Sequence, residues 1–156
     1  MLYLTLKTIH IISSTILFGT GLGSAFYFLR AQQSKNINAL YFAAKNVVLA
    51  DWIFTTPAVI IQPITGFWMI YLLHYPLDSF WIVASITLYV VTGLCWIPVV
   101  YIQIKMFRLI AEAQRLNRSL EKNYYQLERW WFILGWPAFI SVMIIFYLMT
   151  TKPVGF

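Results

Sequence analysis

The sequence has 156 residues, of which 61% are hydrophobic and 10% are charged, and its formal net charge is +6. Soluble domains carry about 25% charged residues, so this composition excludes a soluble enzyme and predicts an integral membrane protein in a lipid bilayer. The only cysteine, Cys95, excludes a disulfide scaffold within the chain. The basic residues lie between apolar stretches and not along one face, so we expect no nucleic-acid partner.

Four apolar stretches are long enough to cross a bilayer as helices, for which about 20 residues suffice. They cover residues 4–29, 47–73, 80–104 and 130–149. A short GSA string in the first stretch resembles a signal-peptide cleavage site, but the stretch is too long for a signal peptide, so we expect a retained helix. The sequence therefore predicts an all-α fold, a polytopic four-transmembrane-helix bundle forming a single membrane domain over residues 1–156.

Basic residues are concentrated in the first and third connections between these stretches, at 30–46 and 105–129. The second connection, 74–79, has no basic residue and contains Asp78. The positive-inside rule places the basic connections in the cytoplasm and both termini on the outer side of the membrane. Apolar residues recur at helical spacing through 105–129, which predicts that helices three and four extend into the cytoplasm as a hairpin turning near 117–123.

Two histidines lie near the predicted outer side of the membrane. His10 is inside the first apolar stretch, with Lys7 one turn before it, and His74 ends the second stretch. A neutral imidazole is a good ligand for haem iron, copper or zinc; the alternative is a histidine that bonds to a neighbouring helix. A structural zinc site requires four ligands, whereas haem needs only one or two. Haem therefore fits this chain better, and a shared His10–His74 metal site stays open as an alternative.

Small residues and prolines add candidate contacts for a cofactor. Gly19 and Gly23 form a GxxxG pair, which permits a homodimer, close packing of another helix, or approach of a flat cofactor. Ser14 and Gly21 belong to the same helix, and Pro57 favours a kink that helps to enclose a cavity. We include these last three residues among the candidate cofactor contacts.

Asp51 is the one acidic residue inside an apolar stretch. A buried carboxylate should be paired or protonated. We expect a structural ion pair with Lys45 or Arg129, and proton transfer is the alternative.

Several segments resemble an uncharacterised bacterial membrane family, domain of unknown function 2269. They read LKTIHI, LADWIFTTPAV, TGFWM, RWWFILGWPAF and TTKP, and together they span essentially the whole chain. That family is in turn similar to HemJ-type protoporphyrinogen oxidases and to CopD-like copper-resistance membrane proteins. The positions that carry this second resemblance are Lys7, His10, Ile11, Pro57, Ala58, Gly66, Lys152 and Pro153.

The resemblance implies that His10 is an axial ligand of haem b. We therefore predict a haem b-binding membrane protein that transfers electrons or acts as a HemJ-like oxidoreductase, with Lys7 and Lys152 meeting the haem propionates. One alternative is a copper-handling protein that uses Met1, Met69 and the two histidines. Another is a non-catalytic scaffold whose cytoplasmic hairpin docks a partner.

Overall fold

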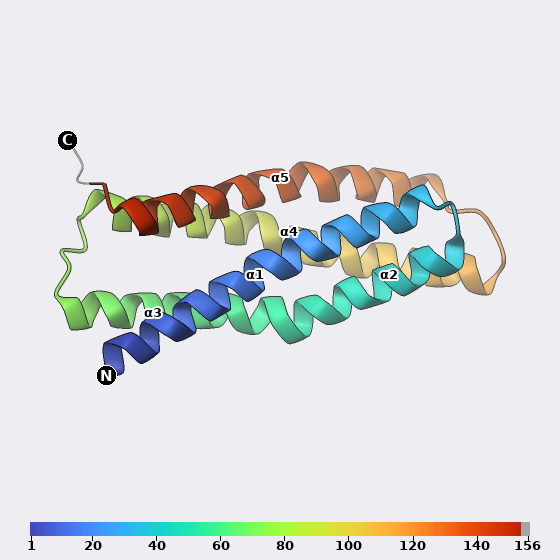
Figure 1. Cartoon of the computed structure of the whole chain (residues 1–156). Coiled ribbons are helices and arrows are strands. Elements are labelled where there is room, and N and C mark those ends of the chain that lie inside the picture. Colours follow the sequence, from blue (N-terminus) through green and yellow to red (C-terminus); the bar gives the residue numbers. More distant parts are fainter. Residues whose placement is uncertain (154–156) are drawn as a thin grey trace.

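A computed structural model describes residues 1–153, and these residues form a helical bundle (Figure 1). The elements in chain order are α1 (Leu2–Gln33), α2 (Ile37–Ala50), the π-helix η1 (Asp51–Thr55), α3 (Thr56–Leu73), α4 (Phe80–Arg115) and α5 (Lys122–Thr151). No strand occurs within this described part of the chain. The all-α prediction is therefore confirmed.

Four helical rods are long and apolar enough to cross a membrane, because α2, η1 and α3 continue into one another over Ile37–Leu73. Figure 1 shows that the N-terminus, the end of α5 and the α3–α4 connection lie at one end of the bundle. We call this the terminal end. The α1–α2 and α4–α5 connections lie at the other end, which we call the basic end. The predicted bundle of four membrane-spanning helices is confirmed.

The first connection is much shorter than the sequence analysis predicted. Only residues 34–36 separate α1 from α2, whereas we expected a loop over 30–46. Asn36 is the N-cap of α2, and its side chain accepts hydrogen bonds from the backbone N–H groups of Asn38 (2.9 Å) and Ala39 (3.3 Å). Such a cap satisfies backbone donors that the first helical turn leaves free. All four rods therefore extend to the basic end, and not only the third and fourth.

The best-packed core lies toward the basic end, where the helices leave the most apolar stretches. Its fully buried members include Ile110 and Met106 of α4 and Tyr124 of α5. Phe28 of α1 packs edge-on against Trp131 of α5, with ring centroids 5.4 Å apart. These contacts confirm the predicted helical hairpin of α4 and α5 and show that α1 packs against it as well.

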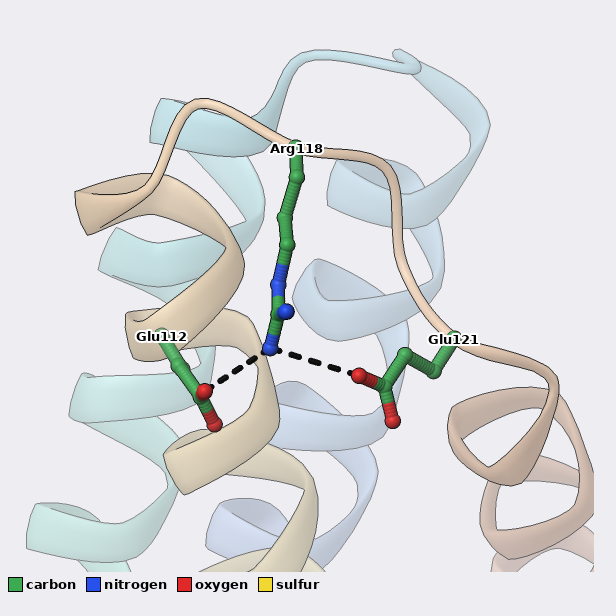
Figure 2. A network of polar contacts seen from close by, with 3 residues as sticks. All are labelled: Glu112, Arg118 and Glu121. Atoms are coloured by element: carbon green, nitrogen blue, oxygen red, sulfur yellow. Dashed lines mark hydrogen bonds and ion pairs between the residues drawn. The ribbon is translucent and has the colours of Figure 1, made fainter.

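The α4–α5 connection, residues 116–121, is braced by one arginine (Figure 2). Arg118 Nη2 lies 2.7 Å from Glu112 Oε1 and 3.3 Å from Glu121 Oε1. All three side chains are substantially exposed to solvent, so this network contributes little to stability, on the order of 1 kcal/mol or less.

A π-helical turn interrupts the second rod. The N–H of Thr56 donates to the carbonyl of Asp51, one residue further back than in an α-helix. Pro57 follows directly, and a proline has no N–H and clashes with the carbonyl four residues earlier. The wider π-turn accommodates this proline, and such turns occur often at functional sites.

Candidate functional site around His10

His10 connects α1 to α3 at the terminal end of the bundle. Its ring atom Nδ1 lies 2.8 Å from the hydroxyl oxygen of Thr65, and the Thr65 side chain is buried between the helices. The imidazole is therefore held by the neighbouring helix, which was one of the two hypotheses drawn from the sequence.

A glutamine fixes the backbone on which this ring is carried. Gln62 Nε2 donates to the carbonyl of His10 (2.7 Å) and to the hydroxyl of Ser13 (2.5 Å). Gln62 and Thr65 are three residues apart and so lie on the same face of α3. We refer to His10, Ser13, Gln62, Thr65 and Gly66 as the His10 cluster.

The Thr65 hydroxyl determines which ring nitrogen of His10 carries the proton. That hydroxyl has one hydrogen and lies 2.8 Å from the carbonyl of Ile61, to which a helical threonine commonly donates. With its hydrogen used there, the hydroxyl accepts from His10, so Nδ1 carries the proton. This assignment follows from the hydrogen-bond network. It leaves the lone pair of Nε2 without a partner among the described residues.

Gly66 allows the imidazole to lie close to α3. A Cβ atom at position 66 would stand 3.4 Å from His10 Cε1, which is van der Waals contact and leaves little room for a branched side chain. By contrast, Gly19, Gly21 and Gly23 of α1 would place a Cβ in open space. The expected packing of the GxxxG pair against another helix is therefore not made among residues 1–153.

The other predicted cofactor contacts on α1 share a face with His10. Ser14 and Gly21 are four and eleven residues after it, which is helical spacing. The Ser14 hydroxyl donates to the carbonyl of Ile11 (2.8 Å), and Gly21 is exposed. Lys7 is also exposed and forms no ion pair within residues 1–153.

Two predicted site residues, Pro57 and His74, lie away from the His10 cluster along the direction of α3. Pro57 precedes Thr65 by eight residues, about 12 Å along the axis of α3. His74 follows Thr65 by nine residues, about 13 Å along that axis, and it caps α3 with a left-handed backbone (φ 52°). The structure therefore does not bring the two histidines together.

Lys152 is engaged with aromatic rings at the terminal end. Its Nζ lies 3.1 Å from the Tyr75 hydroxyl and 4.9 Å and 5.4 Å from the ring centroids of Tyr75 and Trp81. This contact fastens the end of α5 to the α3–α4 connection.

Within the described residues, no group of three or more histidine, cysteine, aspartate or glutamate side chains is placed to hold a metal ion.

The expectation of an ion pair at Asp51 is wrong. The carboxylate is buried, yet the ion pairs found among residues 1–153 involve only Arg118 with Glu112 and Glu121. Lys45 and Arg129 are exposed instead. The Asp51 carboxylate receives a hydrogen bond from Thr55 (2.8 Å), within the π-helical turn.

Gln62 and Thr65 were not among the residues predicted from the sequence. Both are polar residues within an apolar stretch, and their spacing of three residues places them on one helical face. That pattern was the available signal for a polar contact with another helix.

Comparison with known proteins places this arrangement in a family. The sequence profile of a family described as "predicted integral membrane protein (DUF2269)" matches residues 4–153. No curated protein and no solved structure is significantly similar to the chain. Because the match extends over nearly the whole chain and the four rods fit the description, the chain belongs to the DUF2269 family of integral membrane proteins.

Proposed function

We propose that this membrane protein binds haem b, with His10 Nε2 as an axial ligand, and that it transfers electrons. The observation that carries the proposal is the hydrogen bond from His10 Nδ1 to Thr65, because it orients the ring and leaves Nε2 free. Histidines that bind metals almost always donate their other ring N–H to a fixed acceptor. Haem, when bound, would supply one-electron redox chemistry.

The donor set of the cluster fits haem better than a metal ion held by protein alone. Haem requires only one or two axial ligands, and one oriented imidazole is present. Lys7, one turn from His10 and without an ion pair among residues 1–153, would meet a propionate. Lys152 already binds Tyr75 and Trp81, so we assign it to packing at the terminal end and not to haem.

The open face of α1 supports the proposal from the steric side. No heavy atom outside the local helix lies within 4 Å of a Cβ built at Gly21, the glycine that shares a helical face with His10. Bulk beside His10 would therefore find room on the Gly21 side of α1.

We also propose the orientation that the positive-inside rule favours. The basic end carries Arg30 and Lys35. It also carries most of the lysines and arginines of the α4–α5 hairpin. The basic end would then be cytoplasmic, and the His10 cluster would face the periplasmic side of a bacterial inner membrane. The resemblance to HemJ-type oxidases remains a prediction, as does any enzymatic reaction.

Titration of haem into the purified apoprotein in detergent tests the proposal. We expect a Soret band that saturates with haem and that His10→Ala abolishes, whereas His74→Ala, a change at the exposed histidine, retains it. Far-UV circular dichroism of both variants shows whether they are folded. Equal haem uptake by the wild type and by a folded His10→Ala protein would contradict the proposal.

A further inference from the structure

The Asp51 carboxylate has one oxygen that accepts no hydrogen bond of ordinary length from residues 1–153. The residue is 6% exposed, and its Oδ1 atom accepts from Thr55, but Oδ2 is buried without a partner. A buried carboxylate with neither a cation nor full hydrogen bonding is strongly unfavourable. This oxygen is satisfied either by protonation of the carboxyl or by a hydrogen-bond donor that enters from outside the chain.

A second unsatisfied acceptor lines the same cavity. Gln103 of α4 is 8% exposed, and its Oε1 atom is also buried without a partner. Asp51 and Gln103 both line a cavity of about 120 Å³ between the π-helical turn and α4. A carboxylate and an amide at one cavity disfavour an anionic occupant and favour an occupant that donates hydrogen bonds.

The rest of the cavity wall is aromatic and aliphatic. Trp52 and Trp96 line it, as do Val48 and Val100. Indole rings attract cations, and aliphatic walls favour an apolar body. Trp52 is 60% exposed on the outside of the bundle, so the cavity is accessible from the lipid side.

We propose that this cavity binds an organic ammonium ion with a small hydrophobic body. Its N–H groups would donate to Asp51 Oδ2 and Gln103 Oε1, and its alkyl or aryl part would lie between the two tryptophans. The π-helical turn contributes by placing Asp51 and Trp52 side by side at the cavity. This inference is independent of haem, because the His10 cluster shares no residue with the cavity.

Ligand-observed NMR titration of the full-length protein in detergent micelles tests the proposal with n-butylammonium as the probe. The controls are n-butanol, which donates a hydrogen bond but is uncharged, and tetramethylammonium, which is charged but has no N–H. We expect the wild type to bind n-butylammonium more tightly than either control. Asp51→Asn should weaken that binding about tenfold or more, because a charge-assisted hydrogen bond is lost.

Asp78→Asn is the matched control, since it removes an exposed carboxylate outside the cavity. It should leave binding unchanged. Should Asp51→Asn fail to fold, Val100→Phe decides the question, because it fills the cavity and keeps the carboxylate. Absence of binding by the wild type, equal binding of n-butanol, or unchanged affinity in a folded Asp51→Asn or Val100→Phe protein would each overturn the proposal.

Discussion

Replacing Thr65 by valine removes the hydroxyl that holds His10 and keeps the β-branched shape of the side chain. The lost contact is the 2.8 Å hydrogen bond from Nδ1. Side-chain hydrogen bonds between membrane helices contribute about 0.6 kcal/mol on average and up to about 1.7 kcal/mol. Because Thr65 is buried and the bond is short, we expect the coupling free energy between the Thr65 and His10 side chains to lie between about 0.6 and 1.7 kcal/mol.

A double-mutant cycle of Thr65→Val and His10→Ala measures this coupling in the apoprotein. The free energy of unfolding is obtained from SDS titration in mixed micelles, followed by far-UV circular dichroism. The cycle isolates the ring–hydroxyl bond, because Gln62 donates to the backbone carbonyl of residue 10 and that bond survives in His10→Ala. Thr65→Ser is the control that restores the hydroxyl and most of the coupling.

A result near zero would refute the reasoning. Independent sites add within about 0.3–0.5 kcal/mol. Coupling below that limit would mean that Thr65 does not hold the imidazole. The assignment of the proton to Nδ1, and with it the free Nε2 lone pair, would then lose its basis.

Three further predictions concern the packing of the bundle and use the same SDS titration. Ile110→Ala should lower the free energy of unfolding by about 2–5 kcal/mol, since the side chain is completely buried in the core at the basic end; a loss below about 1 kcal/mol would place the core elsewhere. Gly66→Val should lower the free energy of unfolding by about 1–3 kcal/mol, because the valine methyl groups reach past a Cβ position that already stands 3.4 Å from the imidazole. Gly66→Ala should be tolerated. Equal losses of stability in the two variants would contradict the close approach of His10 to Gly66. Arg118→Ala should cost at most about 1 kcal/mol, an effect that shrinks in high salt, because its ion pairs are exposed; a larger, salt-independent loss would disprove that view.

Hydropathy was sufficient to predict the four rods, because a bilayer requires long apolar helices. It was not sufficient for residues 37–46, which we expected to lie in a loop. Those residues belong to α2, whose Leu40, Ala44 and Val47 are buried on one face. The Asn36 cap and this spacing were the signals for a helix that the hydropathy argument did not use.

Single-helix reasoning identified His10 but not its surroundings. Its partners Gln62 and Thr65 lie more than 50 residues away, and the register between two helices is not encoded in either one alone. Asp51 shows a second reason. Its carboxylate bonds Thr55 within a π-helical turn, and the search for a cation partner did not predict such a turn.

The most direct test of the central claim is the absorbance spectrum of the protein purified from membranes of haem-replete cells, in oxidised and dithionite-reduced forms. We predict a Soret band with reduced haem b bands in the wild type, loss of both in His10→Ala, and their retention in His74→Ala. A wild-type protein that is folded, contains its intact His10 cluster and shows no haem absorbance would contradict the proposed role of His10.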